Sequence, residues 1–397
     1  MRRIGDAERR ARLARRHALA PESRAADVVE AAARVVGLHG TDPASVILSA
    51  RARVDGMTVE DLRRAIHDER ALVRHLAMRR TLWVLPREAL GDVQVGASDR
   101  VAAAERRRLA RDVEKAGLRS DGARWLDEAG AAVVAALAGG RQASAAELRA
   151  ELPVLEGATT YGEGKSWGGD VPVAPRVLTV LSASGLVVRG TNDGGWTVSR
   201  PRWALMDAWL GAPLARPDAR AGLAGLVTRW LRAFGPGTAA DLKWWLGSTV
   251  AAVRTALADV GAVEVALDDG STGWVLADDL EEVGPEAPWA ALLPSLDPTT
   301  MGWQARDWYL GPHRARIFDT LGNAGATAWW DGRIVGAWHV VDGGEVLLGL
   351  VEDVGAEGRA ALEAEAERLG VWIGDARIRP RFPSPLSREL ARAGVGP

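Results

Sequence analysis

One short segment near the N-terminus brings together three side chains that could do acid–base chemistry. His39, Thr41 and Asp42 place an imidazole, a hydroxyl and a carboxylate within four residues, on what we expect to be a tight turn. A hydrolase uses such groups to hold a water molecule and to stabilise positive charge opposite it. The same residues also suit a structural role, because Asp42 before Pro43 is a favourable N-cap with proline at the first helical position. Both interpretations stay open at this point.

The composition excludes several other kinds of site. Cysteine is absent, so the chain holds no disulfide, no thiolate nucleophile and no cysteine-ligated zinc or iron–sulfur cluster. His67 and His75 lie eight residues apart without a carboxylate at ligand spacing. No phosphate-binding loop, dinucleotide fingerprint or Gly-x-Ser-x-Gly motif stands in a fitting context. We therefore expect neither a metal nor an organic cofactor.

Charge is distributed unevenly, although the formal net charge is only −2. Residues 1–120 contain 25 Lys and Arg against 17 Asp and Glu, a net charge of +8, which leaves the remainder acidic. This basic part is where we expect a polyanion such as DNA to bind, although Arg-rich helix faces can equally be merely solvated. The candidate DNA contacts near the His39 segment are Arg51, Arg53, Arg74, Arg79 and Arg80.

Helix and strand patterns on both sides position the His39 segment. Apolar residues at helical spacing predict helices at residues 7–19, 25–36 and 44–53. Thr58 opens a capping-box pattern and predicts a further helix to about Asp68. An apolar run, Thr81–Leu85, ends at Pro86 and predicts a strand.

Two later stretches share one order of elements, namely helix, turn, helix and two-stranded hairpin. The first covers residues 144–198, with strands expected at 186–189 and 196–198, and the second covers residues 235–276. This order is typical of a winged helix, and residues 58–85 form a weaker third copy. However, the second helix of the later copy contains Arg254 as its one basic residue and its hairpin is acidic. The basic N-terminal part is therefore the better candidate DNA surface.

Residues 289–380 change character, because glycine turns separate short β-branched and Trp-containing runs. They predict an antiparallel sheet or small barrel, then a helix at 356–369 and a strand at 371–373. We expect an α+β fold, mostly α, of tandem winged-helix repeats with a C-terminal antiparallel β-barrel or sheet region. The expected domains are a basic N-terminal helical or winged-helix domain with the candidate catalytic turn (1–120), a second winged helix (121–215), a third (216–285) and a β-barrel-like region with a C-terminal helix (286–397).

Several motifs, in order along the chain, resemble a known family. Val36–Pro43 followed by Leu48–Arg53 is similar to the segment "GLQAQDP…LWAR" of winged-helix proteins of the AlkZ and YcaQ type. Further matches are Met78–Leu82 (the family's "MRGTLH"), Gly235–Thr238 with Trp244 and Trp245, Leu293–Asp297 and Asp331–Trp338.

The resemblance implies a fold of three tandem winged helices plus a β-barrel, and DNA glycosylase activity on N-alkylated purines or interstrand crosslinks. The family's catalytic motif is Gln-x-Gln, or Gln-x-Asp in one branch, and His39 and Thr41 occupy those positions here. An alkylated purine is already a good leaving group, so the reaction needs a stabilised oxocarbenium-like sugar and a water molecule at C1′. We expect His39 to accept the proton of that water and Thr41 to hold it. Asp42 would supply negative charge if it faces the sugar. If Asp42 caps the helix instead, His39 would have to act in catalysis nearly alone.

We therefore expect a monofunctional DNA glycosylase that acts on N7- or N3-alkylated purines in double-stranded DNA, or unhooks interstrand crosslinks. Two other classes stay open, a noncatalytic winged-helix DNA-binding protein that regulates genes or binds damage, and a scaffold for protein contacts. For distorting DNA, the turn at Asp331-Gly332-Arg333 is favoured over the one at Asp193-Gly194-Gly195, because Arg333 can reach a phosphate. Without an apolar signal region or membrane span, we expect a cytoplasmic monomer.

Overall fold

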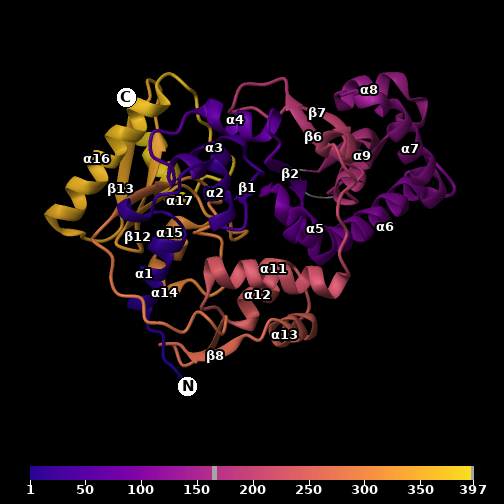
Figure 1. The fold of residues 1–397 in the computed structure, drawn as a ribbon. Helices are drawn as coiled ribbons and strands as arrows, with labels where there is room; N and C mark the ends of the chain where they lie inside the picture. The colour runs from indigo at the N-terminus through magenta and orange to yellow at the C-terminus, as the bar shows by residue number, and fades with distance from the viewer. Residues whose placement is uncertain (163–167, 395–397) are drawn as a thin grey trace.

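The structure is a computed structural model that describes residues 1–162 and 168–394 (Figure 1). About half of the chain is helical, and the strands pair in antiparallel sheets, which confirms the α+β class. Within the described ranges, none of the helices combines the length and the apolar character that a membrane crossing needs.

The N-terminal part packs helices around a three-stranded antiparallel sheet with strand order β1-β3-β2. The predicted helices occur with shorter bounds, the predicted strand lies at Leu82–Pro86, and the Thr58 capping box is formed. The strand at Leu72–Leu76 was not predicted from the sequence. His39, expected in a tight turn, instead lies with Leu38 in a short strand opposite Trp83 and Val84. The elements are α1 (Asp6–Arg16), α2 (Val28–Arg34), β1 (Leu38–His39), α3 (Pro43–Arg51), α4 (Val59–His67), β2 (Leu72–Leu76) and β3 (Leu82–Pro86).

The next part of the chain is mainly helical, with two hairpins. The pair β6–β7 is the hairpin predicted for the first repeat, but its second strand begins at Pro201, so residues 196–198 are not a strand. The elements are α5 (Leu90–Val93), α6 (Asp99–Lys115), α7 (Gly122–Ala136), α8 (Ala145–Glu151), β4 (Ala158–Tyr161), β5 (Gly169–Pro172), α9 (Val173–Ala183), β6 (Val187–Asn192), β7 (Pro201–Leu205) and α10 (Met206–Leu210).

The second repeat has the predicted order of helix, turn, helix and hairpin. Thr238 caps its first helix through a capping box, and Gly247 ends that helix in the left-handed region, with φ of 60°. A long helix, α11 (Ala219–Phe234), precedes it. The repeat consists of α12 (Ala239–Leu246), α13 (Val250–Asp259), β8 (Val263–Ala266) and β9 (Thr272–Val275).

The C-terminal strands form an open four-stranded sheet, so the barrel alternative is wrong. Its order is β10-β11-β12-β13, with β10 and β13 left as edges, because four strands are too few to close around a filled interior. The strand expected at 371–373 is also wrong, since the preceding helix continues to Ile373. The elements are β10 (Ala290–Leu293), α14 (Asp307–Leu310), α15 (Arg314–Ile317), β11 (Thr327–Trp330), β12 (Arg333–Val340), β13 (Val346–Leu350), α16 (Gly355–Ile373) and α17 (Pro385–Gly394).

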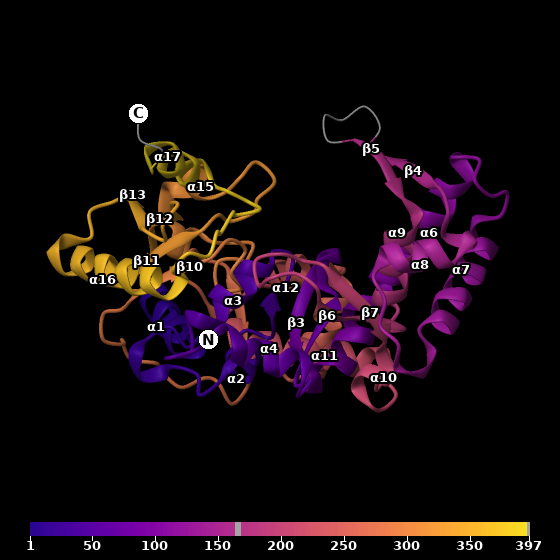
Figure 2. The ribbon, with the colours of Figure 1, turned by 90° about the horizontal axis from the view of Figure 1, so that it is seen from above.

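One large hydrophobic core joins the N-terminal helices, α11–α13 and the C-terminal sheet. Most Trp side chains are buried; Trp303 packs edge to face with Phe234, and Trp308 packs edge to face with Tyr309. A separate core serves α6–α9 and the β6–β7 hairpin. Figure 2 shows α7, α8 and the β4–β5 hairpin at one end of the molecule, α1, α16 and α17 at the other, and α3, α4 and α11 between them.

Buried histidines make the fold sensitive to acid. Burial lowers the pKa of His17 to about 3 and that of His75 to about 4, against about 6.5 in an unfolded chain. Below pH 6.5 these histidines are protonated in the unfolded chain but stay neutral in the folded chain. The free energy of unfolding therefore falls as the pH drops from 6.5 towards 4. Each such histidine contributes up to about 1.4 kcal/mol per pH unit. Urea unfolding at pH 7.5, 6 and 5 should show this loss of stability, and the loss should be smaller in His75→Phe. If the free energy of unfolding depends on pH equally in the variant and in wild type, His75 does not contribute to the acid sensitivity.

Candidate active site

His39 is held almost out of reach of solvent beside an aromatic ring. Its side chain is 8% exposed, and its ring meets the Trp83 ring edge to face at a centroid distance of 5.2 Å. Burial, and then the positive charge of Arg79, lower the pKa of His39 to about 3, although Asp297 opposes the shift. The imidazole is therefore neutral at physiological pH, and a loss of activity near pH 6, as an unperturbed histidine would give, is not expected.

Asp42 is a structural residue in this conformation. Its carboxylate accepts hydrogen bonds from the backbone N–H of Ala44 at 3.2 Å and from the Ser45 hydroxyl at 3.1 Å, and it caps α3. Both carboxylate oxygens thus have donors, as the N-cap interpretation requires. The cap role of Asp42 is thus observed, and a role opposite a sugar stays a prediction.

His39 and Thr41 keep polar atoms that the fold does not use. The Nδ1 atom of His39 and the Oγ1 atom of Thr41 are buried, and neither has a hydrogen-bond partner among the described residues. The Thr41 carbonyl accepts a hydrogen bond from Arg381 at 3.3 Å. Because buried polar atoms are nearly always paired in proteins, these two atoms are candidate hydrogen-bond partners for a water molecule.

Arg53 is fully buried, at the centre of a polar cluster. Its guanidinium donates to both carboxylate oxygens of Asp297, at 2.7 and 2.9 Å, and both side chains are fully buried. It also donates to the Thr299 hydroxyl at 2.8 Å, and Ser49 donates to Asp297 at 2.7 Å. A buried guanidinium needs this full set of acceptors. Charge in the sequence could not distinguish this role from DNA contact.

Three other candidate contacts already have acidic partners. Arg51 pairs with Glu365 and is mostly buried, and Arg80 pairs with Glu105 at 2.7 Å. Arg333 pairs with Glu352 at 2.9 Å. The Asp331-Gly332 turn has positive φ at both residues, as a type I′ hairpin requires, and Gly332 packs against the side chain of Arg10. The turn favoured for distorting DNA is therefore partly covered and neutralised.

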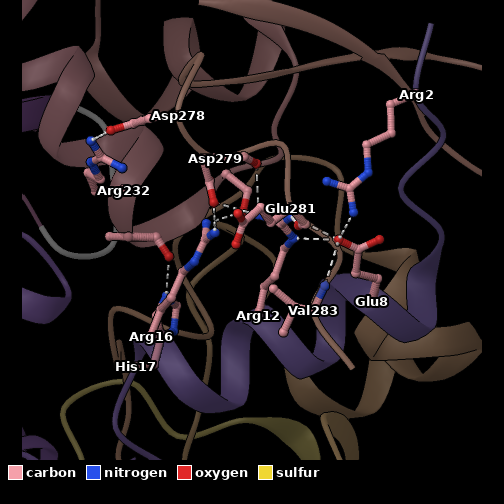
Figure 3. Close-up of polar contacts among 12 residues, drawn as sticks. Arg2, Glu8, Arg12, Arg16, His17, Arg232, Asp278, Asp279, Glu281 and Val283 are labelled. Atoms are coloured by element: carbon pink, nitrogen blue, oxygen red, sulfur yellow. Dashed lines mark hydrogen bonds and ion pairs between the residues drawn. The ribbon is translucent and has the colours of Figure 1, made fainter. Parts of the chain in front are cut away.

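Much of the N-terminal positive charge is neutralised within the protein. In α1, Arg12 pairs with Glu8 and Asp279 at 2.8 Å, and Arg16 pairs with Asp279 at 2.6 Å (Figure 3). The acidic stretch between β9 and β10 thus lies against the basic face of α1. The +8 excess of residues 1–120 consequently overstates the positive surface available to DNA.

Arg79 is the exposed candidate without an acidic partner. Its guanidinium stacks on the Trp244 ring at 4.0 Å from the centroid, with Arg306 at 4.8 Å from the same ring. Desolvation, and then the charge of Arg306, lower the pKa of Arg79 to about 10. Arg79 and Arg80 adopt φ of 55° and 62°, in the left-handed region that costs a non-glycine residue free energy. Backbone strain of this kind clusters at functional sites.

The buried pair predicts a large stability effect. Arg53→Leu leaves the Asp297 carboxylate buried without its counter-ion, and should lower the free energy of unfolding by about 3–5 kcal/mol. The control is Arg64→Leu, which breaks solvent-exposed pairs with Asp61 and Glu69 and should cost much less. Urea unfolding measures both; equal, small losses would show that the buried pair does not hold the fold.

Comparisons with known proteins agree with the fold. The family model described as DNA glycosylase AlkZ-like matches residues 32–372. An interstrand DNA cross-link repair glycosylase from Streptomyces sahachiroi is 26% identical over 215 residues, 52% of this chain. That match spans 57% of the relative, little more than half of its length. The solved structure of Streptomyces sahachiroi DNA glycosylase AlkZ superposes with a TM-score of 0.74 at 22% identity, covering 96% of this chain and 99% of that one, so the two share a fold. Since the family model covers most of the sequence, this chain belongs to the AlkZ-like family of DNA glycosylases.

Proposed function

We propose that this protein is a DNA glycosylase that hydrolyses the N-glycosidic bond of N7- or N3-alkylated purines in duplex DNA, and that it unhooks interstrand crosslinks formed through such positions. The observation that carries the proposal is the neutral His39, with an unpaired ring nitrogen, at the first position of the family's catalytic motif. The relative's name supports a crosslink as one substrate. A monofunctional reaction is proposed because no lysine stands in the segment 36–53.

In the proposed reaction a water oxygen forms a bond to C1′ and the C1′–N bond breaks. The bonding electron pair goes to the cationic purine, which leaves neutral, and the water releases one proton. With a pKa of about 3, His39 is a weak base, so we assign it the positioning of the water through a hydrogen bond, and proton release to solvent follows. The Thr41 hydroxyl supplies a second hydrogen bond to that water.

We further propose that the helix and hairpin units are winged helices and that the chain divides into the four ranges expected from the sequence. In this arrangement the strained turn that holds Arg79 faces duplex DNA next to His39. A noncatalytic DNA-binding protein is the second candidate, favoured by the replacement of both family glutamines by His39 and Thr41.

The test of catalysis uses a duplex containing N7-methylguanine and counts abasic sites. His39→Ala should lower the excision rate by ~10²-fold, the scale for a lost positioning or proton-transfer group, with unchanged DNA affinity. His39→Gln, whose amide can also orient water, should keep most of the activity. The wild-type rate should be flat between pH 5.5 and 8, because His39 stays neutral throughout.

Asp42→Asn is the matched control, since asparagine keeps the cap but removes the charge; its rate should stay close to wild type. A wild-type protein that binds the duplex and never excises the base would favour the noncatalytic candidate. A rate that drops below pH 6.5 and is lost in His39→Gln would mean that His39 takes the proton itself.

DNA affinity should depend on Arg79 more than on Arg80. Arg79→Gln removes an exposed cation without an acidic partner, and should weaken binding to all sequences and reduce the salt dependence by about one unit of slope. Arg80→Gln removes a cation that Glu105 already neutralises, and should change the slope little. Fluorescence anisotropy between 50 and 200 mM salt measures both. The same slope for both variants and wild type would remove this turn from the DNA surface.

A further inference from the structure

A cavity of about 340 Å³ opens beside the His39 segment. Gly40 and Pro43 form one side of it, and α4 and the connection between β6 and β7 form the others. Its size lies at the lower end of the range for small-ligand pockets. Two residues of the segment that carries His39 and Thr41, namely Gly40 and Pro43, thus form part of the cavity wall.

Three arginines line this cavity: Arg63 of α4, whose charge is paired with Glu60 and Asp68, and Arg74 and Arg189, which have no ion pair with a described residue. Arg74 comes from β2 and Arg189 from β6. In the described part of the chain, Arg74 makes one side-chain hydrogen bond, to the Gly190 carbonyl at 3.4 Å. Arg189 lies 5.2 Å from the centroid of the Trp203 ring, and its guanidinium has no hydrogen bond or ion pair with a described residue.

No carboxylate offsets these two charges. Burial, and then the charge of Arg189, lower the pKa of Arg74 to about 10. Burial and the charge of Arg381 lower the pKa of Arg189. Two like charges that face each other in a partly dry cavity destabilise the protein unless a counter-ion binds there. An acidic side chain does not serve as that counter-ion among the described residues, so a bound anion is the remaining source of compensation.

The cavity wall is pre-formed. Asn192 donates to the carbonyls of Gly194 and Val198 at 2.9 Å and accepts from the backbone N–H of Arg200 at 2.7 Å, which fixes the connection between β6 and β7. Trp196, in the same connection, packs edge to face against Trp372 of α16 with a centroid distance of 5.9 Å. The turn at Asp193-Gly194-Gly195 is thus part of a docked wall of the cavity.

We propose that this cavity is a phosphate site in which Arg74 and Arg189 hold the anion, and that the phosphate it takes is the DNA phosphodiester next to the nucleotide under attack. The assignment of DNA as the source rests on the proposed function. A guanidinium matches phosphate oxygens in geometry and keeps its charge at any physiological pH. Gly40 and Pro43 line the cavity, so a phosphate held there would lie next to the chain segment that carries His39 and Thr41. Free phosphate-bearing molecules share this chemistry, and the experiment separates the two sources.

The first arm measures DNA affinity against salt for the full-length protein on an undamaged duplex, so it needs no excision. Arg74→Gln and Arg189→Gln should each reduce the slope by about one, and the double variant by about two. The matched control is Arg63→Gln, which also lines the cavity but pairs with Glu60 and Asp68 at 2.7 and 2.8 Å. Its slope should equal that of wild type.

The second arm measures melting temperature in inorganic phosphate and in chloride at equal ionic strength. Phosphate should raise the melting temperature of wild type and not that of the double variant. Without phosphate, the double variant should melt at no lower a temperature than wild type, because it loses the repulsion between the two arginines. If it melts at a lower temperature, the phosphate-dependent shift is measured on Arg74→Gln and Arg189→Gln separately.

If phosphate raises the melting temperature of wild type alone but the variants keep the wild-type salt dependence of DNA affinity, the cavity binds phosphate and the phosphate does not come from DNA. Unchanged slopes together with no phosphate effect would overturn the proposal. A protein that passes both arms but excises no base would contradict the glycosylase activity alone.

Discussion

The buried ion pair between Arg53 and Asp297 is the contact on which the arrangement of this protein depends. Arg53 follows α3, and Asp297 follows β10 at the start of the C-terminal sheet region. Thr299 extends the cluster to His17 at the end of α1, and His17 reaches the Ala233 carbonyl of α11. Because water cannot replace any of these partners, the guanidinium tolerates little displacement, and three parts of the chain are fixed relative to one another.

The direction of α3 follows from this cluster, and the candidate site follows from α3. The helix packs one face into the main core and another, through Ala44 and Leu48, against the core of the C-terminal sheet. Asp42 is then committed to capping α3, while His39 is held by pairing with β3. The fold thus uses one polar side chain of the segment and leaves buried atoms of His39 and Thr41 free. Those free atoms are what a reaction can use.

Local patterns predicted local structure well. Helical spacing located α1 to α3, the capping box located α4, and an alternating run with a glycine turn located the β8–β9 hairpin. The N-cap interpretation of Asp42 needed only the next few residues. The ordered family motifs supported the overall fold because they extend over most of the chain.

Features that depend on distant partners could not be predicted in this way. Residues 371–373 have β-forming side chains, yet Trp372 donates to the Met57 carbonyl at 2.7 Å and Ile373 enters a core, so packing keeps them helical. Arg53 and Arg79 look alike in the sequence, but their partners differ. Arg53 pairs with Asp297, 244 residues away in the chain, whereas Arg79 stacks on the ring of Trp244. The residues adjacent in sequence do not reveal the helical state of 371–373 or the partners of these arginines. Whether the C-terminal strands close into a barrel likewise depends on how many strands join the sheet, and hydrophobic periodicity does not predict that number.

The pairing of arginines also links binding to chemistry. Arg79, Arg74 and Arg189 lack acidic partners, and Arg79 lowers the pKa of His39, so the field at the free protein's site is positive. Such a field disfavours a cationic purine and an oxocarbenium-like sugar. In the proposed complex, DNA phosphates that bind these guanidiniums would offset the positive field and hold the sugar near the water. In the proposed reaction, therefore, the site becomes able to stabilise positive charge only when the backbone is correctly seated, which ties catalysis to the geometry of the bound duplex.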